Sequence, residues 1–265
     1  MNDHGEVAHG IRTILSVFHD KESARRDRLI GILDRIASGA AAEGITRFDK
    51  CIPHLPSSVY IGCLAQIPAD DDMGLLSMWR AYAASGNGVA LVMNSTPFLA
   101  QTDALAAYST PVLYLTDSEF ADAVDRSLDS IEEHLAAFSL VTFEQLAHMV
   151  FWWLLMMAVS LKHKAFREEA EWRIVYIPGL WKSGAIASGV ECIGGVPQIV
   201  QKIPLKNDEA SGLFGAHPED LINRLIIGPT QFQDVVAEAL VGSLVAAGVR
   251  EPHSRLRFSS IPLRV

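Results

Sequence analysis

Cysteine is scarce in this sequence, which excludes two common ways of stabilising a fold. The 265 residues contain three cysteines, Cys51, Cys63 and Cys192, an odd and widely spaced set. They form no C-x-x-C pair and have no adjacent histidine pair, so neither a disulfide framework nor a zinc site is supported. We therefore expect reduced, mostly buried thiols and no metal. The acidic run 70–72 is interpreted as a solvated loop rather than a cation site.

Basic residues are fewer than acidic residues in this sequence. Lysine and arginine total 22 against 31 aspartates and glutamates, which gives a formal net charge of −9. Such a chain repels phosphate backbones and anionic lipid surfaces, which argues against a general nucleic-acid binder. The basic cluster at 21–28 alternates with acidic residues, as on a solvated helix face.

The sequence lacks an apolar leader and a long apolar run. Its first ten residues contain no apolar signal region, which argues against secretion. The apolar stretch 146–161 is shorter than the roughly 20 residues that cross a bilayer, and it includes His148 and Ser160. We interpret it as part of a core helix over 143–164, and we predict a cytoplasmic protein without a membrane segment.

What the sequence does have is enough apolar residues for a globular core. It is 49% hydrophobic and 20% charged, and no linker or repeat divides it. Helical spacing of apolar residues predicts two helices within 6–42 and others at 75–84, 117–138 and 231–247. Strands are predicted at 58–64, 88–93, 112–115, 170–177, 189–193, 199–204, 223–227 and 257–265, and 44–56 is predicted to be a connection.

This mixture of elements predicts an α+β fold. Helices and strands follow one another without the regular βαβ alternation of a doubly wound sheet. We expect one domain, 1–265, in which a mixed or antiparallel central sheet packs on the long buried helix, with further helices at its periphery.

Several motifs resemble a bacterial family of unknown function. The chain begins N-D-H-G-E at residues 2–6, continues with S-M-W-R-A-Y at 77–82 and glycines, and carries K-A-F-R-E-E-A-E-W-R at 164–173. The family's pattern is N-D-P-x-E, then M-W-x-x-Y, then K-x-x-F-x-x-E-x-E-x-R. The resemblance extends over nearly the whole chain, and the segments 226–229 and 260–264 look like one branch of that family.

The chain departs from the family pattern at its N-terminus. Family members carry a short strand before the first motif, and His4 stands where they have proline. The resemblance therefore implies either a start codon upstream of Met1 or a version that lacks this strand.

The E-x-E-x-R segment has the clearest chemical potential. On a strand, Glu169, Glu171 and Arg173 would point to one face because side chains alternate. Neighbouring carboxylates split their pKa values, and an arginine can clamp a phosphate or carboxylate through two bonds. The alternative is a salt-bridge ladder that only stabilises the strand.

The E-x-E element also resembles the last motif of mono-ADP-ribosyltransferases. That resemblance implies NAD as a cofactor, Glu171 as the catalytic residue that stabilises the transition state, and Glu169 as the residue that directs the acceptor.

A second group of candidates lies at 77–82. Trp79 and Tyr82 could stack on a nucleobase, Arg80 could reach a phosphate, and Ser77 could bond a ribose or cap the short helix. A tryptophan on such a helix is also typical of a packed core. At the N-terminus, Asp3 and Glu6 are further candidates for the site around Glu171.

The sequence thus supports two functional hypotheses. One is a nucleotide-directed enzyme acting on NAD by ADP-ribosyl transfer or glycohydrolysis, in a bacterial defence or toxin context. The other is a non-catalytic ligand-binding or regulatory module. The sequence indicates a small nucleotide as a ligand and identifies no protein partner.

Overall fold

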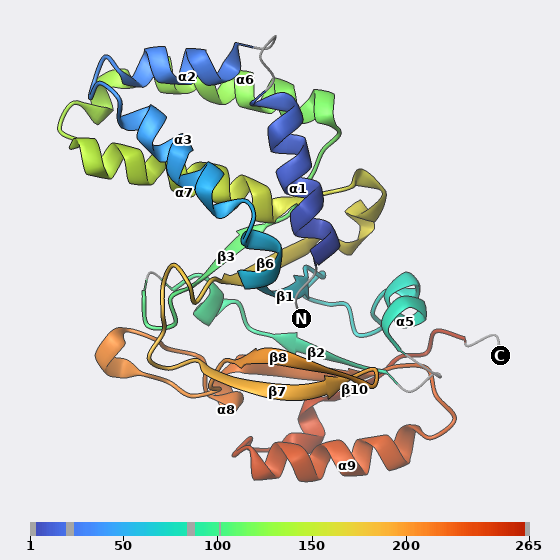
Figure 1. Cartoon of the computed structure of the whole chain (residues 1–265). Coiled ribbons are helices and arrows are strands. Elements are labelled where there is room, and N and C mark those ends of the chain that lie inside the picture. Colours follow the sequence, from blue (N-terminus) through green and yellow to red (C-terminus); the bar gives the residue numbers. More distant parts are fainter. Residues whose placement is uncertain (1–3, 20–23, 84–87, 101, 263–265) are drawn as a thin grey trace. The chain divides into compact units, whose positions relative to one another are not determined.

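The chain folds into two compact units, each built from two segments of sequence. The computed structural model describes residues 4–19, 24–83, 88–100 and 102–262 (Figure 1). Unit 1 comprises Met1–Ala65 and Tyr108–Trp181, and unit 2 comprises Gln66–Ala107 and Lys182–Val265.

Unit 1 is dominated by helices. Its helices are α1 (His4–Val17), α2 (Arg25–Leu33), α3 (Ala40–Cys51), α4 (Leu55–Ser58), α6 (Asp117–Glu133), η3 (Leu135–Phe138), α7 (Phe143–Ser160) and η4 (Lys164–Glu169). Its strands are β1 (Tyr60–Ala65), β3 (Ala107–Pro111), β4 (Leu113–Tyr114), β5 (Leu161–Lys162) and β6 (Glu171–Tyr176).

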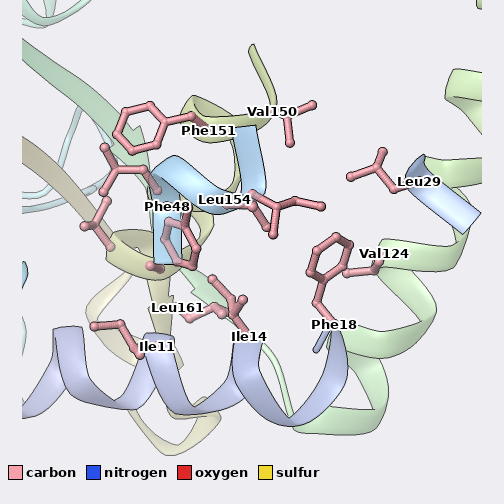
Figure 2. Packing of buried hydrophobic residues seen from close by; sticks show 14 of the residues in the cluster. Ile11, Ile14, Phe18, Leu29, Phe48, Val124, Val150, Phe151, Leu154 and Leu161 are labelled. Atoms are coloured by element: carbon pink, nitrogen blue, oxygen red, sulfur yellow. The ribbon is translucent and has the colours of Figure 1, made fainter. Parts of the chain in front are cut away.

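Helix α7 is the centre of this unit. It begins at a capping box, in which Thr142 and Gln145 satisfy each other's backbone N–H groups. Its buried side chains include Val150, Phe151 and Leu154, which belong to one apolar cluster with residues of α1, α2, α3 and α6 (Figure 2). The predicted core helix is therefore present, and burial of its apolar face is what stabilises it.

Two glycines allow other helices to approach α7 closely. A Cβ on Gly10 of α1 would lie 1.9 Å from the carbonyl oxygen of Ala158, and one on Gly44 of α3 would lie 2.5 Å from that of Ala147. No side chain fits at either position, so both contacts depend on glycine.

The sheet of unit 1 has the order β1-β6-β3. Strands β1 and β6 are antiparallel, with Tyr60 opposite Tyr176 and Ala65 opposite Glu171. Their residues Ile61 and Val175 belong to the same apolar cluster as α7. Nearby, β4 and β5 form a short parallel pair.

Unit 2 has a second three-stranded sheet and a hairpin. Its helices are α5 (Leu76–Tyr82), η2 (Thr96–Phe98), η5 (Glu209–Ser211), α8 (Pro218–Leu221), α9 (Gln233–Ala246) and η6 (Pro252–Arg255). Its strands are β2 (Val89–Met93), β7 (Ala187–Ile193), β8 (Val196–Lys202), β9 (Ile222–Ile227) and β10 (Leu256–Phe258).

The sheet of unit 2 has the order β10-β9-β2, with β10 parallel and β2 antiparallel to β9. A small apolar cluster joins Leu225 and Leu256 of this sheet to Leu244 of α9. Strands β7 and β8 pair with each other in a separate antiparallel hairpin.

These elements confirm the predicted α+β class, with mixed and antiparallel sheets and a long buried helix. The predicted connection at 44–56 is wrong, since α3 covers most of it. Ala41, Gly44, Ile45 and Phe48 follow a helical period and are buried, but a glycine in this run concealed the pattern. The single domain over 1–265 stays a prediction, because compact units are not by themselves independent domains.

Within the described residues, α7 is the helix that is long and apolar enough to cross a membrane by length and composition. Half of it, 50%, is buried inside the structure, which is typical of a core helix. The cytoplasmic location stays a prediction.

Candidate functional site

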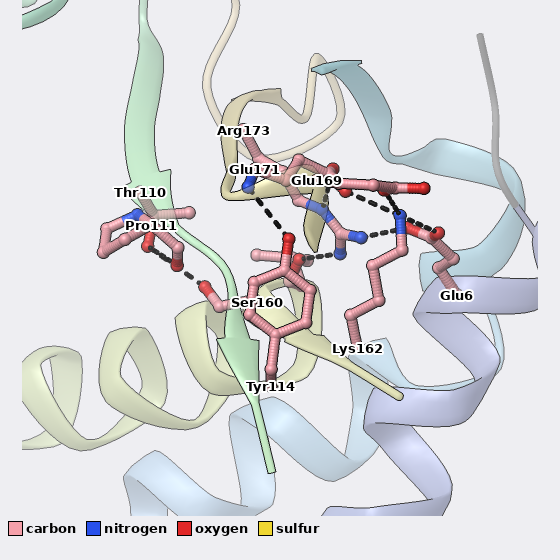
Figure 3. Close-up of polar contacts among 10 residues, drawn as sticks. Glu6, Thr110, Pro111, Tyr114, Ser160, Lys162, Glu169, Glu171 and Arg173 are labelled. Atoms are coloured by element: carbon pink, nitrogen blue, oxygen red, sulfur yellow. Dashed lines mark hydrogen bonds and ion pairs between the residues drawn. The ribbon is translucent and has the colours of Figure 1, made fainter. Parts of the chain in front are cut away.

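The candidate site is an ion-pair cluster in unit 1 with Lys162 at its centre. The Lys162 ammonium lies 2.8 Å from an oxygen of Glu6, 2.6 Å from one of Glu169 and 2.7 Å from one of Glu171 (Figure 3). Only 7% of the Lys162 side chain is exposed. Since an ammonium group has three N–H donors, the three carboxylates account for all of them.

Arg173 is the second cation of the cluster, and its side chain is 0% exposed. Its Nε lies 2.8 Å from Glu171 Oε1, and it donates to the backbone carbonyl of Val159 at 2.6 Å. A further nitrogen pairs with Oε2 of Glu6. The guanidinium therefore links β6, the end of α7 and helix α1.

Glu171 is held by both cations at once. Oε1 pairs with Arg173, Oε2 pairs with Lys162, and 4% of the side chain is exposed. Burial tends to raise the pKa of this carboxyl, but hydrogen bonds from Arg173, Cys63 and Lys162 outweigh burial and hold the pKa below its ordinary value. Glu171 is therefore ionised at neutral pH and has no oxygen left without a cationic partner.

Both cations are stabilised in their charged form. Burial disfavours the charge on Lys162, yet the hydrogen bonds that its ammonium donates to Glu169, Glu171 and Glu6 raise its pKa. The pKa of Arg173 is likewise raised, because hydrogen bonding and attraction from Glu171 and attraction from Glu6 outweigh the effect of burial. With three carboxylates and two cations, the cluster carries a net charge of about −1.

The backbone around Glu169 differs from the predicted strand. Glu169 ends the 3-10 helix η4, Ala170 adopts a left-handed conformation with φ 42°, and β6 begins only at Glu171. A non-glycine residue rarely adopts this conformation. The prediction that Glu169, Glu171 and Arg173 alternate along one strand is therefore wrong for Glu169. The turn at Ala170 nevertheless places the Glu169 carboxylate next to the Lys162 ammonium.

Cys63 and Tyr114 complete the surroundings of Glu171. Cys63 lies opposite Arg173 in the β1-β6 pairing, and burial together with a hydrogen bond to Glu171 raises the pKa of its thiol to about 12. The backbone N–H of Glu171 donates to the Tyr114 hydroxyl at 2.8 Å. Burial raises the pKa of that hydroxyl, so it remains neutral. The thiol is a weak nucleophile in this setting because it is protonated.

The expectation of mostly buried thiols is wrong for two of the three cysteines. Cys63 and Cys192 are exposed, Cys51 is half-buried, and all three are free. Cys63 combines an exposed residue surface with a hydrogen-bonded thiol, because β1 is the edge strand of its sheet.

Glu169 makes one ion pair in the cluster, whereas Glu6 and Glu171 each make two. Oε2 of Glu169 pairs with Lys162, 19% of the Glu169 side chain is exposed, and within the described part of the chain Oε1 has no hydrogen-bond or ion-pair partner. Phe166, whose ring centroid lies 5.0 Å from the Lys162 ammonium, stands beside it. Glu169 is thus the carboxylate of the cluster that has an oxygen left for a ligand.

The structure brings together four of the predicted site residues. Glu6, Glu169, Glu171 and Arg173 share the cluster, as the hypothesis for Glu6 and Glu171 required. Asp3 lies outside the described residues.

The other four candidates, Ser77, Trp79, Arg80 and Tyr82, belong to α5 of unit 2. The predicted site residues thus belong to two different compact units.

The position of Trp79 favours packing over ligand stacking. Its indole N–H donates to the carbonyl of Met73 at 2.9 Å, and 8% of the residue is exposed. Added Cβ atoms on Gly74 and Gly228 would each lie 2.9 Å from the indole ring. Tyr82, by contrast, is 67% exposed, and Arg80 is exposed as well.

Sequence reasoning missed Lys162 as a member of the site. Lys162 follows the apolar stretch 146–161 directly and is buried in β5. The available signal was the charge imbalance of the E-x-E-x-R segment, in which one arginine accompanies two glutamates. The acidic run 70–72 also has structural partners, since Asp72 pairs with Arg224 and Arg257. No group of three or more metal-ligating side chains was found among the described residues.

Comparison with known proteins gives one match. Residues 78–174 match a family described as Protein of unknown function (DUF2971). This segment includes α5 from Met78 onward, the core helix α7 and β6 up to Ile174. Neither the curated proteins nor the solved structures contain a match to the chain.

Proposed function

We propose that this protein is a non-catalytic ligand-binding or regulatory module, in which the E-x-E-x-R segment stabilises the fold. The observation that supports the proposal is the state of Glu171, whose two oxygens are paired with buried Lys162 and Arg173. A glutamate that stabilises positive charge on a ribose must face that ribose. Here both oxygens face cations of the protein, which reduces the carboxylate's capacity to stabilise another positive charge.

The energetics of buried ion pairs also support a structural role for Glu171. Removing one partner of a buried ion pair typically costs about 3–5 kcal/mol, because the opposite charge is left without compensation. Glu171 has two such partners, and Arg173 joins it to the end of α7 through Val159. The cluster therefore connects α1, α7 and β6 at a point where each contributes a charge or a carbonyl.

The enzyme hypothesis retains one supporting feature. Glu169 is partly exposed and has one oxygen without a partner among the described residues, so it could orient a water molecule or an acceptor. NAD-dependent ADP-ribosyl transfer or glycohydrolysis is therefore the second candidate, with Glu169 as the carboxylate that has a single ion pair.

Incubation with NAD distinguishes the two candidates. We expect wild-type protein to release no nicotinamide above a protein-free blank, as measured by chromatography, and to show no thermal shift with NAD. Release by the wild type, together with its loss in Glu169→Gln, would overturn the proposal. Glu169→Gln is the appropriate variant because it removes a carboxylate that has a single ion pair and is expected to leave the fold intact.

A further inference from the structure

The β7-β8 hairpin of unit 2 has two outer edges that differ chemically. Strands β7 and β8 are joined by Gly194 and Gly195, both with positive φ (57° and 82°), and Ile193 lies opposite Val196. Two-residue turns of this kind place the flanking residues in a hydrogen-bonded pair. Within the described residues no other strand pairs with either edge.

The alternation of an antiparallel ladder then fixes which backbone groups point outward. Since Ile193 and Val196 exchange hydrogen bonds, the next pair, Cys192 and Pro197, does not. The position of Pro197 agrees with this, because proline has no N–H to give to the ladder. On β7 the outward N–H and C=O groups therefore belong to Ser188, Val190 and Cys192.

These outward groups have no partner within the part of the chain that the structure describes. Backbone hydrogen bonds outside the ladder reach no residue from 187 to 202. The outer edge of β8 lacks a donor at Pro197, whereas β7 presents a complete row of donors and acceptors. β7 is therefore the edge that another strand can pair with.

One face of this edge carries exposed apolar side chains at its centre, with Ser188 and Gln201 at one end. Val190 is 69% exposed and lies opposite Ile199, which is 58% exposed. Cys192 and Pro197 continue the same face. An isolated two-stranded hairpin is only marginally stable in water, so a further strand would stabilise it.

We propose that β7 pairs with β7 of a second copy of this chain, antiparallel and centred on Val190. In this register Val190 lies opposite Val190 of the second copy, and Ser188 lies opposite Cys192. The outward groups of one edge thus meet those of the other, as an isologous two-fold contact requires. Glu191 lies opposite Gly189, so no like charges face each other. The two hairpins become one four-stranded sheet with a continuous apolar strip.

A pair of proline variants tests the proposal. Val190→Pro removes an outward N–H of β7, and Ile199→Pro removes the corresponding N–H of β8. Both positions lie in the same non-hydrogen-bonded pair, so both variants retain the ladder of the hairpin. Light scattering across a range of micromolar concentrations should show a dimer for wild type and Ile199→Pro, and loss of the dimer for Val190→Pro.

A second pair of variants, with lysine in place of proline, keeps the test informative if the proline variants misfold. Val190→Lys places two lysines opposite each other at the two-fold axis, whereas Ile199→Lys places a lysine on the same face away from it. We expect Val190→Lys to abolish the dimer. Ile199→Lys should retain a larger fraction of dimer than Val190→Lys at the same protein concentration. A monomeric wild type, or a dimer that survives both Val190 substitutions, would overturn the proposal.

Discussion

Among individual residues, Lys162 and Arg173 decide what Glu171 can do. Each cation is buried, and their hydrogen bonds to Glu171, together with that from Cys63, outweigh the effect of burial on this carboxylate. A carboxylate used in this way contributes to stability only while both partners remain. This is why the same E-x-E-x-R pattern that suggests catalysis also fits a structural role.

Cys63 offers a separate test of the cluster. The residue is exposed, yet its thiol pKa is raised to about 12 by burial and by the hydrogen bond to Glu171. Since the thiolate is the reactive form, iodoacetamide near pH 8 should alkylate Cys63 more than about tenfold more slowly than a free peptide cysteine. Mass spectrometry of the digested protein measures the rate. Alkylation as fast as in the peptide would show that the thiol is not bonded to Glu171.

The sequence allowed part of this cluster to be predicted. Glu169, Glu171 and Arg173 could be grouped because they are close along the chain, and Glu6 because it belongs to a recognisable motif. Lys162 could not, since its partners come from α1, η4 and β6 and its burial depends on how these elements pack. The left-handed conformation of Ala170 could not be predicted either, because nothing in the sequence distinguishes an alanine that adopts a positive φ.

Among the elements, the crossing of α1 and α7 should be the most sensitive to side-chain size. A Cβ on Gly10 would lie 1.9 Å from the carbonyl oxygen of Ala158, whereas one on Gly31 of α2 would have no heavy atom within 4 Å. We expect Gly10→Ala to lower the free energy of unfolding by about 2 kcal/mol or more, because overpacking forces the helices apart. Urea unfolding measures the change.

Gly31→Ala is the matched control for that substitution. Both glycines lie within helices, and alanine is favoured over glycine in a helix by about 0.5–1 kcal/mol. We therefore expect Gly31→Ala to stabilise the protein slightly. Equal effects of the two substitutions would contradict the close approach of α1 to α7.

Helices with a clear apolar pattern could be predicted from the sequence. Strands whose length depends on tertiary contacts could not. Thr116 and Thr142 begin α6 and α7 with capping boxes, and the sequence shows an apolar period over α6 and a long apolar stretch in α7. The tail was predicted as a strand over 257–265, of which 263–265 lie outside the described residues. Up to residue 262, β10 covers Leu256–Phe258, where β9 is available to pair with it. Strand length in such a case depends on the neighbour rather than on local composition.

At the scale of the whole molecule, the chain alternates between its two units. Unit 1 is completed only after the first segment of unit 2, so neither unit is continuous in sequence. A discontinuous arrangement has no single boundary along the chain, so the sequence offered no signal for two compact units, and the single domain over 1–265 stays a prediction.

Acid should destabilise the protein through its depressed carboxyls. The pKa of Glu171 is held below its ordinary value of 4.5, and the pKa values of Asp125 and Glu219 are also lowered by their arginine partners and local hydrogen bonds. The unfolded chain then binds more protons than the folded one, so stability is present above the unfolded pKa and is lost as pH falls through the folded pKa. Thermal unfolding from neutral pH to below pH 4.5 should show this loss. If stability stayed constant over that range, these carboxyls would not be paired.

The most direct test of the account is the stability of Glu171→Gln beside Glu169→Gln, measured by urea unfolding at neutral pH. Both variants remove one negative charge with almost no change of shape. We predict that Glu171→Gln lowers the free energy of unfolding by about 2–4 kcal/mol, because it leaves two buried cations undercompensated. Glu169→Gln should lower it by about 1 kcal/mol, because Glu169 is partly exposed. If Glu171→Gln were as stable as wild type, the cluster would not hold the fold, and Glu171 would again be a candidate for catalysis.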